Sequence, residues 1–144
     1  MVRTSFKVLV LPYWRSSSGQ IEYAVFKKGE DYWQGIAGGV EGGESPLDAA
    51  RREAMEEGGI QPNAGFSALD TVSGFPFNNR VITQYAFAVE LNDKAVRLSE
   101  EHSEYRWLPF DEAWRTLKWD GDRAALTELN TVLMSGRRHP VSET

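Results

Sequence analysis

A short helix bounded by glycines constrains the fold more than any other stretch of the chain. Ser45 suits the position before a helix, because its hydroxyl can accept a backbone N–H of the first turn. Pro46 suits the first helical position, where its missing N–H costs nothing. Gly59 is a natural stop signal. The pattern predicts a helix over Pro46–Glu57, preceded by a glycine-rich loop over Gly38–Gly43.

This helix gathers three carboxylates on one face. Glu53, Glu56 and Glu57 stand at positions i, i+3 and i+4, where like charges repel. A bound divalent cation would remove that repulsion, and oxygen ligands suit Mg²⁺ or Mn²⁺. The alternative is a solvated acidic face, but the glycine-rich loop beside it favours a metal site. Arg52 can either reach back to this loop or pair with Glu56 one turn ahead.

The spacing of this stretch resembles the signature of the Nudix hydrolases. Gly38 is followed by five residues, Glu44, seven residues and then the run REAMEEGGI over 52–60. We call this stretch, Gly38–Ile60, the box. The one soft departure is Ala54, where the family usually carries a larger aliphatic residue. The resemblance implies an α/β fold, an α/β/α sandwich with a central mixed sheet, over a single domain of residues 1–144. It also implies Mg²⁺-dependent hydrolysis of a nucleoside diphosphate linked to another group.

The same resemblance implies roles for particular residues. Glu53, Glu56 and Glu57, with the backbone carbonyl of Ala37, would hold one to three metal ions, while Glu41 and Glu44 could support them. The base that activates water is Glu53, Glu56 or a glutamate from a distant loop. The cluster Glu100, Glu101 and Glu104 supplies candidates for that loop, and Glu101 is the one we select. A charged turn without a catalytic role is the alternative for this cluster.

Further residues are candidates for contact with the substrate. The glycines Gly38 and Gly39 let backbone approach a charged ligand closely. Cations and aromatics elsewhere could bind phosphate or stack on a ring, although each is more commonly a solvated cation or a packing residue. These candidates are Lys27, Lys28, Arg80, Trp33, Phe75 and Phe77. His102 could touch the phosphates, or it could be a surface histidine without a role.

The remaining elements follow from hydrophobic patterns and turn residues. Strands are predicted over 6–13, 21–28, 66–74, 81–91 and 105–108, and helices over 110–117 and 122–134. The strand over 81–91 has two apolar faces, which predicts burial on both sides. The FPFNNR segment, Phe75–Arg80, is predicted to be a loop, because Pro76 and two asparagines punctuate it. Residues 137–144 are expected to form a loose tail.

Composition narrows the class of function. A chain of 144 residues fits one domain, and the net charge of −5 argues against a general nucleic-acid or membrane-surface binder. The chain has no cysteine for a disulfide framework, and its N-terminal apolar run is too short for a signal peptide or a membrane span. A cytoplasmic location is therefore expected. The family resemblance adds the expectation of an enzyme that acts on a small molecule, as a monomer or a homodimer.

Two stretches bear on the substrate. The segment Tyr32–Glu41 and the segment Glu101–Leu108 resemble the bacterial dihydroneopterin triphosphate or dATP pyrophosphohydrolases. The second segment is also similar to the asymmetrical diadenosine tetraphosphate hydrolases, which usually carry a proline before the box glycines. Residues 33–37 contain no proline, which favours a triphosphate substrate and release of pyrophosphate. A nucleotide-binding sensor of the same family is the alternative of another class, and the three intact box glutamates favour the enzyme.

Overall fold

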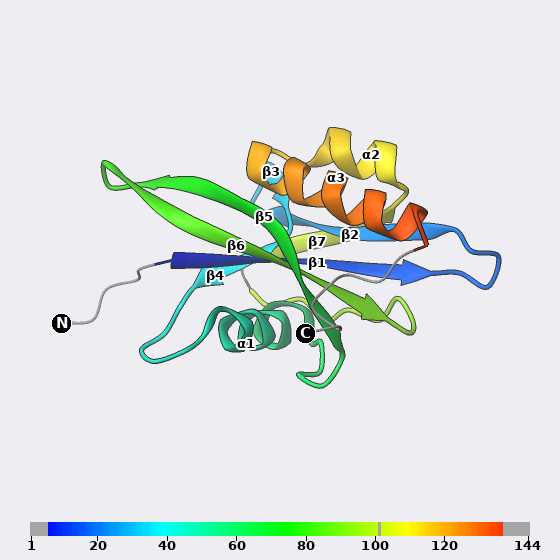
Figure 1. Cartoon of the computed structure of the whole chain (residues 1–144), viewed down its shortest axis with the longest axis horizontal. Helices are drawn as coiled ribbons and strands as arrows, with labels where there is room; N and C mark the ends of the chain where they lie inside the picture. The colour runs from blue at the N-terminus through cyan, green and yellow to red at the C-terminus, as the bar shows by residue number, and fades with distance from the viewer. Residues whose placement is uncertain (1–5, 101, 137–144) are drawn as a thin grey trace.

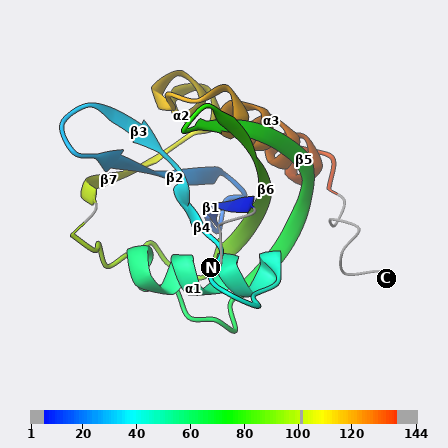
Figure 2. The same cartoon turned by 90° about the vertical axis from the view of Figure 1, so that its left-hand side faces the viewer.

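The computed structural model describes residues 6–100 and 102–136, with the side chains of Phe75 and Phe77 excepted. A mixed sheet lies between α1 on one face and the pair α2 and α3 on the other (Figures 1 and 2). The strands are β1 Phe6–Arg15, β2 Ile21–Lys28, β3 Tyr32–Gln34, β4 Ile36–Gly39, β5 Gly65–Phe77, β6 Arg80–Leu91 and β7 His102–Leu108. The helices are α1 Pro46–Gly58, α2 Phe110–Thr116 and α3 Asp120–Met134. None of these described helices is both long and apolar enough to cross a membrane.

Strand β1 is the centre of the sheet. It pairs antiparallel with β2 and β4 and parallel with β6. Its alternate residues enter two separate cores, since successive side chains of a strand point to opposite faces. Val8 and Val10 pack with the residues beneath α1, whereas Leu9 and Leu11 pack with those beneath α2 and α3. The predicted α/β/α sandwich is confirmed.

The sheet divides beside β1. Strand β2 pairs with β1 over residues 13–15, and β4 takes its place over residues 7–10. Meanwhile β2 continues alongside β3 and β7. The connection between β3 and β4 crosses at Gly35, where an added Cβ would lie 2.7 Å from Leu9 and 2.9 Å from Leu11 side-chain atoms. The close approach at Gly35 lets the chain step from one half of the sheet to the other.

Helix α1 forms where the local signals place it. The Ser45 hydroxyl accepts the Asp48 backbone N–H at 3.1 Å, and Gly59 adopts the left-handed conformation that ends the helix. The helix extends one residue beyond the predicted Pro46–Glu57. Its small residues, Ala50 and Ala54 among them, are fully buried against the sheet, so the alanine that departs from the family pattern packs in the core.

The prediction that Phe75–Arg80 is a loop is wrong. Strands β5 and β6 continue through this segment, and Phe77 pairs with Arg80 across a two-residue turn. Asn78 and Asn79 both have positive φ, which is the geometry that tight hairpin turns require. Pro76 is tolerated because β5 is an edge strand, where a missing N–H costs no pairing on the open side.

Two further predictions for the strands need correction. Strand β6 is buried on both faces only over residues 86–89, while Val81 is 75% exposed. The β5–β6 hairpin runs past the helices that cover the sheet, which explains the exposure (Figure 1). Strand β7 begins at His102 rather than at Tyr105, because pairing with β2 extends it. The predicted tail, residues 137–144, lies outside the described residues.

Candidate active site

Arg52 fastens the glycine-rich segment to α1. Its guanidinium donates to both carboxylate oxygens of Glu44, at 2.7 and 3.0 Å, and to the Gly39 carbonyl at 2.9 Å. It also lies 3.1 Å from Glu53 and 3.3 Å from Glu56. The Arg52 side chain therefore reaches back to the glycine-rich loop and also pairs with Glu56, the two contacts that its position in the sequence allows.

The charges of this cluster stabilise one another. The hydrogen bonds from Arg52 are the main reason that the pKa of Glu44 is lowered, and the backbone N–H of Glu41 adds to them. The same pairing with Glu44 raises the pKa of Arg52. The loop between β4 and α1 is thus held by a charge-assisted network rather than by apolar packing.

At Gly38 the backbone packs directly against Glu53, a candidate catalytic residue. A Cβ at this position would lie 2.1 Å from the Glu53 carboxylate, which is far inside contact distance. The predicted loop over Gly38–Gly43 needs correction, since Gly38 and Gly39 end strand β4, where they pair with Val8 and Lys7. Pairing with β1 extends β4 to Gly39, and the absence of a side chain at Gly38 leaves room for the Glu53 carboxylate.

The three box glutamates differ in exposure. Glu53 and Glu57 are buried, whereas the side chain of Glu56 is 56% exposed. Within residues 6–100 and 102–136, no three acidic or histidine side chains already meet in a metal-binding group. The donor set nevertheless fits a hard divalent cation, since all its atoms are oxygens and the exposed Glu56 can turn towards Glu53.

His102 and its neighbours in β7 lie differently from the predicted acidic loop. His102 is buried, which excludes a surface histidine, and its Nδ1 lies 3.9 Å from Oε1 of Glu57. Glu104 is inside the strand and contacts Arg106 at 3.3 Å. Glu101, the candidate distant base, lies outside the described residues, so its role stays a prediction.

The candidate substrate contacts are spread over the sheet. Lys27 and Lys28 end β2, while Arg80 is exposed at the start of β6 beside the hairpin turn. The ring of Trp33 packs against the core beneath α2 and α3, and the Arg106 guanidinium lies 4.7 Å from its centre. The side chains of Phe75 and Phe77 are not described, so their stacking role also stays a prediction.

Sequence reasoning missed a group of polar residues next to this site. Lys7 pairs across the sheet with Gly39 on one side and with Gln84 on the other. Gln84 and Asp122 are buried, although neither lies in the signature. Asp122 begins the apolar stripe of α3, and this charge at a core position is the signal that could have revealed it.

Burial changes the charge state of Asp122. Desolvation raises the pKa of its carboxyl to about 6, although the Gly35 backbone N–H, at 2.9 Å, and Lys7 act in the opposite direction. Lys7 is affected in turn: burial first, and then the charge of Lys28, lower its pKa, while Glu53, Asp122 and Glu57 act to raise it. The pKa of Lys7 therefore depends on both the box carboxylates and Asp122.

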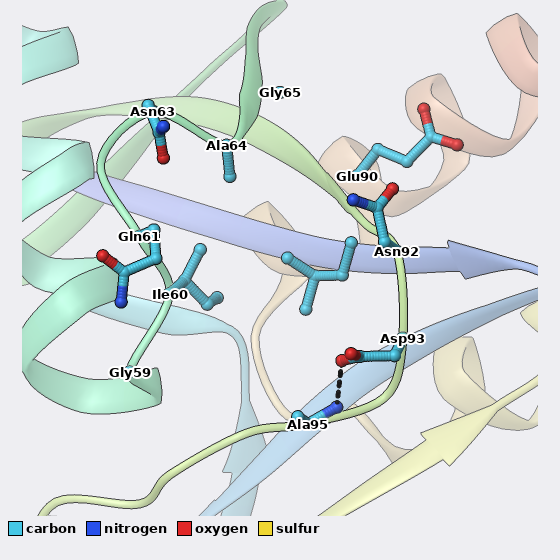
Figure 3. Close-up of a pocket in the computed structure, with 11 residues that line it drawn as sticks. Gly59, Ile60, Gln61, Asn63, Ala64, Gly65, Glu90, Asn92, Asp93 and Ala95 are labelled. Carbon is cyan, nitrogen blue, oxygen red and sulfur yellow. Dashed lines mark hydrogen bonds between the residues drawn. The ribbon is translucent and has the colours of Figure 1, made fainter.

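A groove near the C-terminal end of α1 is separate from these groups. It has a volume of about 570 Å³ and is lined by residues that include Ile60, Ala64, Glu90 and Asp93 (Figure 3). The Ala95 backbone N–H donates to Asp93 at 2.9 Å on its far wall. Its lining contains none of the box carboxylates, so we do not place the substrate there.

Comparison with known proteins identifies the family. The model of the NUDIX domain matches residues 14–129, which include the whole signature. The chain therefore belongs to the NUDIX family and is a Nudix hydrolase.

Individual relatives show which members of the family are similar. The chain is 36% identical over 115 residues to a bis(5'-nucleosyl)-tetraphosphatase [asymmetrical] of Sus scrofa, covering 74% of this chain and 76% of that protein. A NUDIX hydrolase structure from Listeria monocytogenes is 32% identical, with a TM-score of 0.83 over 93% of this chain and 99% of that one. The dihydroneopterin triphosphate pyrophosphohydrolase of E. coli is 23% identical, with a TM-score of 0.75 over 88% and 96% of the two chains. At that identity, the last likeness bears on the fold alone.

The first prediction concerns Gly38. We expect Gly38→Ala to displace the Glu53 carboxylate and to lower kcat/KM by about 100-fold or more, a loss of roughly 3 kcal/mol of transition-state stabilisation. The matched control is Gly42→Ala, because nothing lies within 4 Å of a Cβ added there. Steady-state kinetics of the two variants provide the measurement. Equal activity of the two variants would contradict the packing role of Gly38.

The second prediction concerns Asp122. Its pKa in the folded protein lies above the ordinary value of 3.8, so the folded state binds the extra proton, and the free energy of unfolding falls as pH rises from about 4 to about 6. We expect Asp122→Asn to match the wild type near pH 4 and to be more stable by roughly 1–3 kcal/mol near pH 8. Thermal or urea unfolding at both pH values measures this. The exposed Asp120→Asn is the control, and a stability difference that does not change with pH would contradict the assignment.

Proposed function

We propose that this Nudix hydrolase cleaves a phosphoanhydride bond in a nucleoside or pterin polyphosphate, with Mg²⁺ or Mn²⁺ as the cofactor. The observation that carries the proposal is the packing of Glu53 against Gly38, while Arg52 binds Glu53, the Gly39 carbonyl and Glu44 of the loop. This arrangement sets a buried carboxylate beside a backbone that a charged ligand can approach closely.

Different residues of the chain would bind the metal, accept the proton and hold the loop in position. Glu53, Glu56 and Glu57, with the Ala37 carbonyl at the middle of β4, are the proposed metal ligands. A divalent ion bound there would neutralise charge on the phosphates and lower the pKa of a water molecule. Glu53 or Glu56 in the box, or Glu101 before β7, would accept the proton from the attacking water. Arg52 holds the loop and the helix in position while this happens.

Cations near the box would orient the phosphates. Lys28, at the end of β2, lies close enough to Lys7 to affect its pKa, so the two ammonium groups share one region. Lys27 precedes Lys28 on β2, and Arg80 could reach in from the hairpin. Two or more cations around a polyphosphate chain fix its register relative to the water and restrict hydrolysis to one bond.

The substrate that we favour is a triphosphate on one ring, with release of pyrophosphate. Its support is the absence of proline in residues 33–37 and the resemblance of the 101–108 segment. A dinucleoside tetraphosphate is the second candidate, and it is supported by the name of the relative from Sus scrofa at 36% identity. A sensor that binds a nucleotide without cleaving it would not need the carboxylates of the box, all of which are present.

The third prediction tests the site. Glu56→Gln removes a proposed ligand from an exposed position, so we expect kcat to fall by about 100-fold or more while the melting temperature is unchanged or slightly higher. Glu112→Gln, an exposed glutamate in α2, is the matched control. Turnover is measured at saturating Mg²⁺, and Mn²⁺ affinity is measured separately. Near wild-type turnover of Glu56→Gln would overturn the assignment of Glu56.

The fourth prediction tests the substrate. We expect kcat/KM for dihydroneopterin triphosphate or a nucleoside triphosphate to exceed that for diadenosine tetraphosphate at fixed Mg²⁺. The products distinguish the bonds, since pyrophosphate indicates attack at the α-phosphorus and single phosphates do not. A preference of about tenfold or more for the dinucleotide, roughly 1.4 kcal/mol, would replace the triphosphate with the second candidate.

A further inference from the structure

We propose that His102 is a positioning residue for the metal site: its imidazole restrains the buried carboxylate of Glu57, so that the carboxylate is already oriented when the ion binds. The inference rests on the proposed function, because it treats Glu57 as one of the metal ligands. On this assignment His102 touches neither the substrate nor the reacting atoms, and it acts only through Glu57.

Glu57 lies where a buried negative charge is costly. Its side chain is 7% exposed, and it belongs to the last turn of α1, where the backbone carbonyls give the helix end a partial negative charge. That turn, all of which is described, contains no basic residue. A carboxylate at such a position depends on donors or cations from other elements. Lys7 of β1 is close enough for Glu57 to raise its pKa.

His102 brings a second group to this carboxylate, from strand β7. Its side chain is completely buried, and Nδ1 lies 3.9 Å from Glu57 Oε1. The imidazole also packs against Phe26, with 5.4 Å between the ring centres, and Phe26 is itself fully buried in the core beneath α1. Close packing of this kind leaves the imidazole little freedom to turn away from the carboxylate.

A β-bulge turns His102 towards α1. Side chains alternate along a regular strand, so His102 and Tyr105, three residues apart, would point to opposite faces. Here both rings contact Phe26. The pairing of β7 with β2 is irregular at this point, and Ser103 is the extra residue, whose hydroxyl donates to the Gly29 carbonyl at 3.0 Å. Bulges commonly redirect a side chain beside a functional site.

The segment that leads into β7 is fastened to the end of α1. The Arg97 backbone N–H donates to the Gly58 carbonyl at 2.9 Å. The same segment passes so close to the helix end that a Cβ on Gly59 would lie 2.9 Å from the Arg97 Cβ. The chain before His102 is therefore attached to the residues that directly follow Glu57, which fixes the separation of the imidazole and the carboxylate.

A restrained ligand binds a metal ion more tightly than a mobile one. An imidazole N–H near one oxygen limits rotation of the carboxylate and leaves the other oxygen for the ion. Removal of a group that orients a metal ligand typically lowers metal affinity by about 10- to 100-fold. The predicted effect concerns metal binding rather than proton transfer, so it can be measured without substrate or turnover.

The experiment measures the affinity for Mn²⁺ alone, at equilibrium, by electron paramagnetic resonance. His102→Phe keeps a ring against Phe26 but removes both nitrogens, so we expect the dissociation constant to rise about tenfold or more. His102→Asn can place a carboxamide nitrogen where Nδ1 lies, and it should restore most of the affinity. Tyr105→Leu removes another ring that contacts Phe26 from β7, and this matched control should leave the affinity unchanged.

A double-mutant cycle with Glu57→Gln tests whether His102 acts through Glu57. If it does, His102→Phe should cause little further loss of affinity in the Glu57→Gln protein. An equal loss in both backgrounds would overturn the proposal. The proposal also fails if Tyr105→Leu loses as much affinity as His102→Phe, or if His102→Asn binds no better than His102→Phe, because the role of His102 is then only structural.

Two further outcomes separate this inference from the proposed function. If His102→Phe does not fold, as judged by its melting temperature without metal, His102→Leu takes its place in the cycle. If the wild type binds Mn²⁺ but hydrolyses no polyphosphate, the proposed function fails and the affinities still decide the role of His102. If the wild type binds no Mn²⁺, both the proposed function and this inference are overturned.

Discussion

The contacts of Arg52 are the constraint on which the site depends. One guanidinium binds the carboxylate of Glu44, the carbonyl of Gly39 and the carboxylate of Glu53, so loop, strand and helix hold a single relative position. That position is possible only because Gly38 has no side chain, since Glu53 occupies the space where a Cβ would lie. The fixed spacing of the signature thus has a steric cause as well as an electrostatic one.

The division of the sheet determines what else can lie near this site. Strand β4 replaces β2 beside β1, which brings the box glycines next to Lys7 and places Gly35 over the core under α3. Through Gly35, Asp122 is hydrogen-bonded to the same short segment that ends at Gly39. Two regions far apart in sequence, the box and the start of α3, therefore both lie near Lys7 of β1.

The sequence predicts best what depends on neighbours along the chain. The cap at Ser45, the stop at Gly59 and the shared face of the glutamates are local features, and the structure has the helix where they place it. The hairpin at Asn78 and Asn79 and the extension of β4 depend on pairing with distant strands, so local turn signals misled the prediction. Lys7, Gln84 and Asp122 could not be grouped beforehand, because only the pairing of β1 with β6 and the packing of α3 bring them together.

The site's carboxylates are stabilised in two different ways. Glu44 has a guanidinium on both oxygens and a lowered pKa, so its charge is compensated within the protein. Asp122 has one backbone N–H and the influence of Lys7, and desolvation raises its pKa. Because its folded-state pKa lies above the ordinary value, ionisation of Asp122 lowers the free energy of unfolding as the pH rises. The loop beside the box is therefore fixed by compensated charges, whereas the start of α3 is held beside Gly35 by a carboxylate whose ionisation opposes folding.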